Sequence, residues 1–108
     1  MDLLKAFWKE QAEWSRATFG DDQVRGPRGP LLHLQKEVYE ALDAFEHGRT
    51  EDFHEELVDC LFLVFDSSRR AGLTYEMLAG KAFQKLEKNK KRKWNPPTSD
   101  VPVEHVRD

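Results

Sequence analysis

The sequence has 108 residues, of which 39% are hydrophobic and 34% are charged, and it carries a net charge of −3. This length indicates a single domain covering residues 1–108, and the composition favours a helical protein over a β-sandwich. The small net charge does not by itself indicate a partner. The single cysteine, Cys60, excludes an internal disulfide and is typical of a reducing compartment.

Membrane insertion is not expected from the hydropathy of the chain. The longest unbroken apolar run is residues 60–65, far shorter than the roughly 20 residues that span a bilayer. The N-terminal segment has no basic stretch ahead of an apolar core, so we expect no signal peptide. The sequence therefore predicts a cytoplasmic protein with no membrane partner.

The spacing of apolar residues predicts helices, with no strand between them. The first helix covers about residues 2–19 and ends in a glycine- and proline-rich segment, residues 20–30. The second helix is expected to start with Pro30 as its first residue and to end near Gly48, which serves as a C-terminal cap.

Two further helices follow in the second half of the chain. The third begins after Thr50, a good N-cap, and closes with two arginines before Gly72. The fourth runs from Thr74 to about Lys93. The last 14 residues contain three prolines and are expected to form an extended tail. The pattern as a whole predicts an all-α fold, a four-helix bundle.

The third helix is apolar on more than one face. A helix with this pattern needs burial on all sides, which a chain of this size rarely provides alone. We therefore expect a homo-oligomer, either a homodimer or a homotetramer. The apolar residues behind this prediction are Phe53, Leu57, Val58, Leu61, Phe62, Leu63, Val64 and Phe65.

Two pairs of acidic residues lie on the second and third helices. Glu37 and Glu40 are three residues apart, as are Glu56 and Asp59, so each pair shares one side of its helix. A short connection favours antiparallel packing of these helices, which brings all four carboxylates together. Such a group either takes up protons or binds cations.

A metal ion explains why Asp59 lies inside an apolar run, because the ion offsets the charge that its neighbours cannot. Ligands that are all oxygen favour a hard cation, Mg²⁺ or Mn²⁺. The competing interpretation is that the acids form a solvated helix face. Asp66 lies seven residues beyond Asp59. It either joins the site or contacts a bound nucleotide, or it pairs with Arg69 or Arg70.

The fourth helix carries a polar stripe that includes Lys85, Asn89 and Arg92. Cations near a carboxylate-bound metal are the arrangement that a polyphosphate needs. Trp94 follows soon after and either stacks on a base or caps the bundle. Trp8 and Trp14 are more typical of a core, although Trp14 is retained as a candidate for ligand contact.

These motifs together resemble the MazG-like all-α nucleoside triphosphate pyrophosphohydrolases. That family is marked by Glu-x-x-Glu, a gap and Glu-x-x-Asp, followed by Lys-x-x-x-Asn and an arginine. The chain is most similar to the dATP/dGTP pyrophosphohydrolase branch, which includes MazZ-type enzymes and occurs in many phages. The segments that carry this closer likeness are QAEWSRATFG, HLQKE, EELVD, DSSRRAG, KNKKRKW and the terminal EHVRD. The chain departs from the family at Lys36, where many members have a second glutamate, and at NPP after Trp94.

The resemblance implies hydrolysis of a purine deoxynucleoside triphosphate, dGTP or dATP, to the monophosphate and pyrophosphate. It also implies two or three Mg²⁺ or Mn²⁺ ions, held by the catalytic acids Glu37, Glu40, Glu56 and Asp59. The alternatives are a helical module that binds nucleic acid through the basic residues between 81 and 93, and an oligomerisation domain without catalysis. Because the acids repel a phosphate backbone, no stable nucleic-acid partner is expected.

Overall fold

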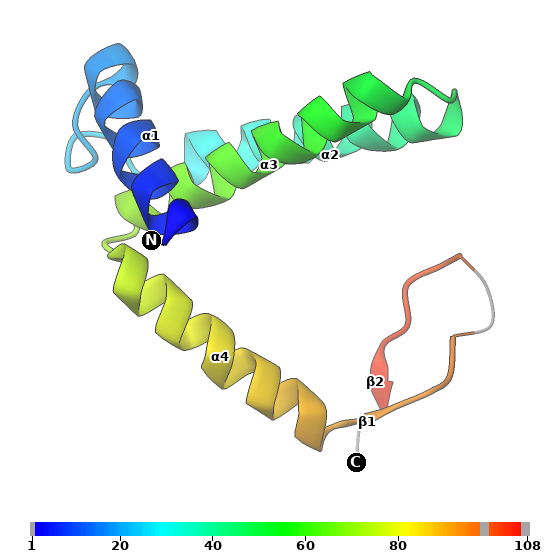
Figure 1. Ribbon diagram of the computed structural model, residues 1–108. Helices are drawn as coiled ribbons and strands as arrows, with labels where there is room; N and C mark the ends of the chain where they lie inside the picture. Colours follow the sequence, from blue (N-terminus) through cyan, green and yellow to red (C-terminus); the bar gives the residue numbers. More distant parts are fainter. Residues whose placement is uncertain (1, 98–99, 107–108) are drawn as a thin grey trace. The chain divides into compact units, whose positions relative to one another are not determined.

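The computed structural model describes residues 2–97 and 100–106 (Figure 1). Four helices and two short strands are present among these residues, which confirms the all-α prediction. The terminal motif EHVRD is described only as far as Val106, so its last two residues lie outside the described part. The elements are α1 (Leu3–Phe19), α2 (Arg28–Glu46), α3 (Thr50–Arg70), α4 (Tyr75–Lys91), β1 (Lys93–Trp94) and β2 (His105–Val106).

The chain divides into two compact units, residues 1–75 and 76–108. The first unit contains α1, α2 and α3. Its core lies where α1 meets α3: the ring centroids of Trp8 and Phe65 are 4.8 Å apart, and those of Phe7 and Phe65 are 5.8 Å apart. Because Trp8 and Phe65 are both buried, this aromatic contact helps to hold α1 against α3.

Helices α2 and α3 form an antiparallel hairpin with a three-residue connection, as the short loop predicted (Figure 1). Gly48 has a φ of +70° in this turn, a conformation that glycine adopts without the steric cost of a Cβ atom. On α2, Ala41 and Ala44 are buried. Small side chains at these positions allow the two helices to approach closely.

Two predicted helix starts differ from the structure. Helix α2 begins at Arg28 with Pro27 at the cap position, whose φ of −79° suits a helix start. Pro30 therefore lies inside the first turn, where a missing N–H costs nothing. The prediction that Thr50 is the N-cap of α3 is wrong: Arg49 holds that position without a side-chain cap, and Thr50 is the first helical residue.

The end of α3 agrees with the prediction, since its last turn carries Arg69 and Arg70 and Gly72 follows with a φ of +90°. The hydroxyls of Ser67 and Ser68 each donate to the carbonyl one turn earlier, at 2.7 Å. These bonds satisfy two buried polar groups within the helix itself.

The second unit contains α4 and the strand pair. Strands β1 and β2 are antiparallel, with Lys93 opposite Val106 and Trp94 opposite His105. The tail after α4 is otherwise without regular structure where it is described. No helix among the described residues is both long and apolar enough to cross a membrane.

Candidate active site

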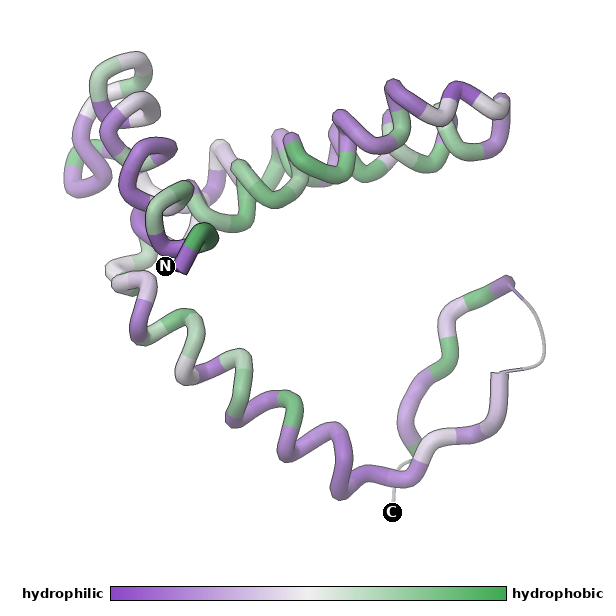
Figure 2. Tube along the Cα trace, in the orientation of Figure 1, coloured by the Kyte–Doolittle hydropathy of each residue, from purple (hydrophilic) through white to green (hydrophobic). Residues whose placement is uncertain are grey.

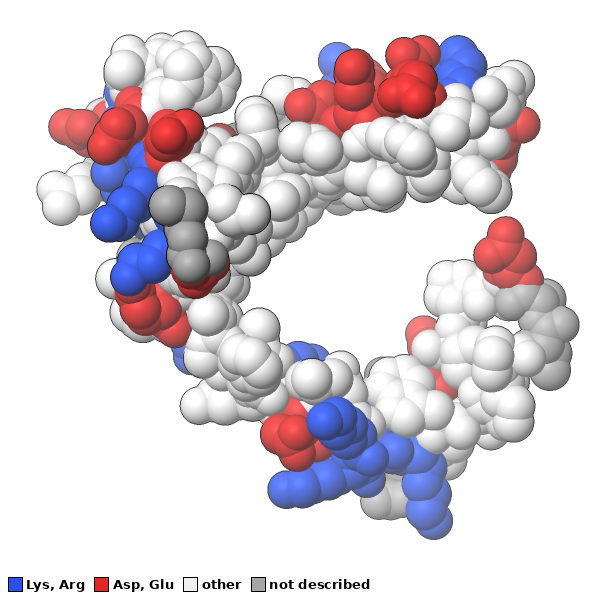
Figure 3. Space-filling view, viewed as in Figure 1, with Lys and Arg blue, Asp and Glu red and all other residues white. Residues whose placement is uncertain are grey.

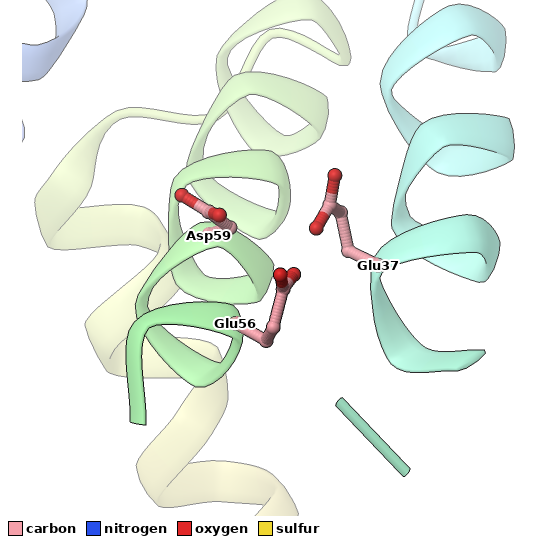
Figure 4. A group of neighbouring side chains, drawn as sticks. All are labelled: Glu37, Glu56 and Asp59. Atoms are coloured by element: carbon pink, nitrogen blue, oxygen red, sulfur yellow. The ribbon is translucent and has the colours of Figure 1, made fainter. Parts of the chain in front are cut away.

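Three of the four predicted acids meet on the α2–α3 hairpin. Glu37 of α2 and Glu56 and Asp59 of α3 each offer a carboxylate oxygen, and these oxygens all lie within 4.8 Å of one another (Figure 4). The i, i+3 spacing on α3 places Glu56 and Asp59 on one side of that helix, and the antiparallel packing brings Glu37 opposite them. This group is called the acidic cluster below.

Glu40 lies at the border of the acidic cluster, one turn beyond Glu37 on α2. It is half-buried, and its interaction with Glu37 contributes to lowering the Glu37 pKa. Its charge also contributes to raising the pKa of Glu56. Glu40 is therefore electrostatically part of the site, although its oxygens are not among those that converge within 4.8 Å.

The two central acids have opposite pKa shifts. The pKa of Glu56 is raised to about 7, first because its carboxyl hydrogen-bonds to Glu37, and then because of burial and the charges of Glu37, Glu40 and Asp59. The pKa of Glu37 is lowered, first by the same hydrogen bond and also by His33. In the metal-free protein these opposite shifts favour a proton on Glu56 over one on Glu37, at pH values below about 7.

One oxygen of this pair has no hydrogen-bond partner. Glu56 Oε2 is buried and receives no donor from the described residues. A buried carboxylate oxygen without a donor is costly, whereas a cation satisfies it directly. Because every side chain in the cluster offers oxygen, the donor set fits a hard divalent cation such as Mg²⁺ or Mn²⁺.

His33 is a residue near the site that the sequence analysis did not assign. Its Nε2 lies 2.9 Å from Glu37 Oε1, so it fixes the orientation of that carboxylate. The signal was present in the sequence, since His33 precedes Glu37 by four residues and i, i+4 side chains meet on a helix.

Asp66 is paired with Arg69, one of the two arrangements that the sequence left open. Its Oδ1 accepts from Arg69 and also from Nε2 of Gln11 on α1, at 2.9 Å. Gln11 Oε1 in turn accepts from Arg69 at 2.5 Å. All three residues are buried. No local pattern points to Gln11, because it is 55 residues from Asp66 along the chain.

The candidate phosphate-binding residues lie in the second unit. Arg92 donates to Asn89 Oδ1 at 3.2 Å, and Trp94 Nε1 donates to the Asn89 carbonyl at 2.8 Å. These contacts gather three of the predicted residues around the end of α4. Lys85 lies one turn before Asn89 and is exposed. The contact of these residues with a nucleotide stays a prediction.

The two candidate tryptophans have aromatic neighbours within their own units. Trp94 packs its ring against His105 across the strand pair, with centroids 5.6 Å apart. Trp14 is half-exposed and meets Phe19 edge-on at 5.5 Å. Trp8 is buried in the core, as the sequence predicted.

Comparison with known proteins identifies the family of the chain. The dATP/dGTP pyrophosphohydrolase family matches residues 7–108, which include all the candidate site residues. The Eaa protein of Salmonella phage P22 is 39% identical over 100 residues. That match covers 93% of this chain, but the chain spans only 29% of the phage protein. No solved structure matches the chain. With a family match over nearly its whole length, the chain belongs to the dATP/dGTP pyrophosphohydrolase family.

Proposed function

We propose that this protein hydrolyses a purine deoxynucleoside triphosphate, dGTP or dATP, to the monophosphate and pyrophosphate, and that the reaction depends on Mg²⁺ or Mn²⁺. Family membership supports nucleotide pyrophosphohydrolase activity. The observation that carries the metal dependence is the convergence of Glu37, Glu56 and Asp59, with the buried Glu56 oxygen lacking a donor.

The acidic cluster, together with Glu40, holds the two or three ions in this proposal, and two divalent ions already balance the charge of four carboxylates. A divalent ion, when bound, polarises phosphate oxygens and makes a water molecule more acidic. His33 keeps the Glu37 carboxylate directed at the cluster through its 2.9 Å contact. A carboxylate of the cluster accepts the proton that the attacking water loses.

The charge that develops on the leaving pyrophosphate needs cations. The family resemblance implies Lys85 and Arg92 for this role, and within the second unit Arg92 donates to Asn89 Oδ1. The new bond joins the water oxygen to phosphorus, and the bond that breaks releases the pyrophosphate or the monophosphate as leaving group. Attack at the α- or the β-phosphorus gives the same two products.

The phage relative supports a setting in the cytoplasm of a bacterial host. Two other functions remain as rivals, a helical module that binds nucleic acid and an oligomerisation domain without catalysis. Nucleic-acid binding through the basic residues of α4 weakens steeply with salt and needs no divalent ion. Neither rival explains a buried, unpartnered carboxylate oxygen in the acidic cluster.

The test is to incubate the protein with each deoxy- and ribonucleoside triphosphate, with Mg²⁺, with Mn²⁺ and with a chelator, and to measure pyrophosphate. We expect metal-dependent release from dGTP or dATP. Glu56→Gln should abolish turnover with little loss of fold, whereas Glu55→Gln, on the exposed neighbour outside the cluster, should leave turnover unchanged. No release from any nucleotide with either metal contradicts the proposal, and salt-sensitive DNA binding then separates the two rivals.

A further inference from the structure

A pocket of about 210 Å³ opens on the first unit, between the start of α2 and the second half of α3. Its walls include the aromatic ring of Phe19, the polar side chains of His33, Asp66 and Arg70, and the apolar side chain of Leu63. An apolar pocket with a few convergent polar groups is the usual form of a small-molecule site. None of these wall residues belongs to the acidic cluster, so the pocket has to be explained separately.

The pocket adjoins the acidic cluster along both helices. On α2, His33 lines the pocket and also contacts Glu37 at 2.9 Å. On α3, Leu63 lies one turn after Asp59. Asp66 lies seven residues after Asp59, which is about 10 Å along the helix axis. That length is comparable with the distance from the phosphates of a nucleotide to the far edge of its base. A nucleotide with its phosphates at the cluster therefore reaches the pocket with its base.

Two polar groups of the pocket wall have no hydrogen-bond partner within the described residues: the acceptor Asp66 Oδ2 and the donor Arg70 Nε. Asp66 uses Oδ1 for its contacts with Gln11 and Arg69, and no hydrogen bond to its Oδ2 is formed within the described residues. Arg70 Nε is buried and has no hydrogen-bond partner in the described part of the chain. A buried donor without a partner, as Arg70 Nε is, costs free energy that a matching acceptor on a ligand recovers.

Guanine offers the complementary set of groups. Its N1–H and 2-amino group donate to a carboxylate, and its O6 and N7 accept from an arginine. Adenine presents an unprotonated N1 and no 2-amino group, so it cannot make the paired N1–H and 2-amino contact with the Asp66 carboxylate. Its 6-amino group is a donor at the position where guanine offers the O6 acceptor to an arginine. Phe19 adds an aromatic surface for a base, and its ring meets the Trp14 ring edge-on, with centroids 5.5 Å apart.

We propose that this pocket receives the purine base of the substrate and that Asp66 and Arg70 make it selective for guanine over adenine. The inference rests on the proposed function, because the acidic cluster must hold the phosphates for the base to reach the pocket. A bare phosphate is the other ligand that arginines attract, through Arg25 and Arg70. The carboxylate of Asp66 in the same wall disfavours an anion.

The first test compares kcat/KM for dGTP and dATP. The wild-type protein should prefer dGTP. Arg70→Gln should lower kcat/KM for dGTP by about tenfold or more, in the range of one lost arginine contact to guanine, and should change kcat/KM for dATP much less. Arg70→Lys keeps the charge but loses the planar fork, so it should also reduce the preference. Arg28→Gln, on an exposed arginine of α2 outside this pocket, is the matched control and should keep the preference.

The second test measures binding of dGMP, dAMP and pyrophosphate, which needs no turnover. We expect tighter binding of dGMP than of dAMP, and a loss of that difference in Arg70→Gln, with circular dichroism showing an unchanged helical content. Equal losses for dGMP, dAMP and pyrophosphate in Arg70→Gln identify a phosphate site and overturn the inference. A wild-type preference for adenine also overturns it.

These outcomes separate the two proposals. If the wild-type protein releases pyrophosphate from nucleotides but Arg70→Gln affects dGTP and dATP equally, the base pocket is refuted and the proposed function stands. If no nucleotide is hydrolysed but dGMP binds selectively and Arg70→Gln abolishes that selectivity, the proposed hydrolysis fails, whereas the guanine pocket stands as a binding site whose phosphates the cluster holds without cleaving them.

Discussion

The carboxyl group of Glu56 is surrounded by other acids, and one of its oxygens is buried without a donor. Its pKa is raised from the ordinary value of 4.5 to about 7. A proton on Glu56 and a divalent ion at the cluster relieve the same repulsion, so they compete for the site. Both protein stability and metal binding therefore depend on pH through this residue.

We predict that the metal-free protein loses stability as pH rises from 5 to 8. Between 4.5 and about 7 the folded protein keeps a proton on Glu56 that the unfolded chain releases, so the free energy of unfolding falls with pH. The lowered pKa of Glu37 acts below 4.5 and does not affect this window. Urea denaturation at several pH values, with a chelator present, measures the slope.

Glu56→Gln provides the comparison, because glutamine stays neutral at every pH. The variant should match the metal-free wild type at pH 5 and exceed its stability at pH 8, and its stabilisation by Mg²⁺ should be smaller. Glu55→Gln should keep the wild-type slope. Identical slopes in wild type and Glu56→Gln would mean that the proton is held elsewhere.

At the level of single residues, the sequence predicted which acids meet, but it did not predict the side chains that hydrogen-bond to them. The i, i+3 spacing on each helix was enough to bring Glu37, Glu56 and Asp59 together once the two helices packed. The i, i+4 spacing of His33 and Glu37 on α2 is enough to predict the contact between them. Gln11 carried none, since its contact with Asp66 depends on how α1 docks against α3.

The docking of α1 on α3 depends mainly on aromatic contacts. Phe65 is 3% exposed and meets both Phe7 and Trp8. Arg69 also lies over the Trp8 ring, 5.6 Å from its centroid, which adds a cation–π contact. The same interface carries the Gln11–Asp66–Arg69 network, so packing at Phe65 also supports one wall of the proposed base pocket.

We predict that Phe65→Ala destabilises the protein by about 3–5 kcal/mol, the usual cost of removing a buried phenylalanine ring. Chemical denaturation followed by circular dichroism measures this loss. Phe83→Ala removes a ring that is 72% exposed and should cost far less. Equal, small effects of the two substitutions would show that α1 is held by something other than the Phe65 contacts.

Element types were easier to predict than element ends. The four helices follow from apolar spacing, but the start of α3 was misplaced by the preference of threonine for N-caps. In the structure the Arg49 carbonyl accepts from Phe53 N at 2.9 Å, so the helix begins one residue after Arg49. The β1–β2 pair was not indicated at all, because two-residue strands are too short to show an alternating pattern.

Over the whole molecule, the segregation of residue types is the clearest feature. Acidic side chains gather on one side of the α2–α3 hairpin (Figure 3). Hydrophobic residues recur along both helices (Figure 2), and many of them are exposed. The fold class was predictable because the apolar spacing is strong, and the α2–α3 pairing was predictable because the connection is short. The prediction that a second copy covers the remaining apolar surface is not tested by the structure of a single chain.

The exposed apolar residues of the hairpin form a stripe on each helix. Val38, Leu42 and Phe45 recur at i, i+4 and i+7 on α2, as do Leu57, Leu61 and Val64 on α3, and all six side chains are at least 36% exposed. Contiguous apolar surface of this kind marks an interface in most proteins. The homodimer or homotetramer expected from the sequence is the arrangement that buries it.

We therefore predict that the protein sediments as a dimer or tetramer at micromolar concentration. Leu42→Glu places a charge in the middle of the α2 stripe and should shift the protein toward monomer, because burying an unpaired carboxylate is costly. Val24→Glu is the matched control, since Val24 is 79% exposed in the loop before α2 and outside the stripe. Sedimentation velocity with parallel circular dichroism distinguishes dissociation from unfolding. A wild-type protein that sediments as a folded monomer at this concentration contradicts the prediction, because the apolar stripes would then be stable in water without a second copy.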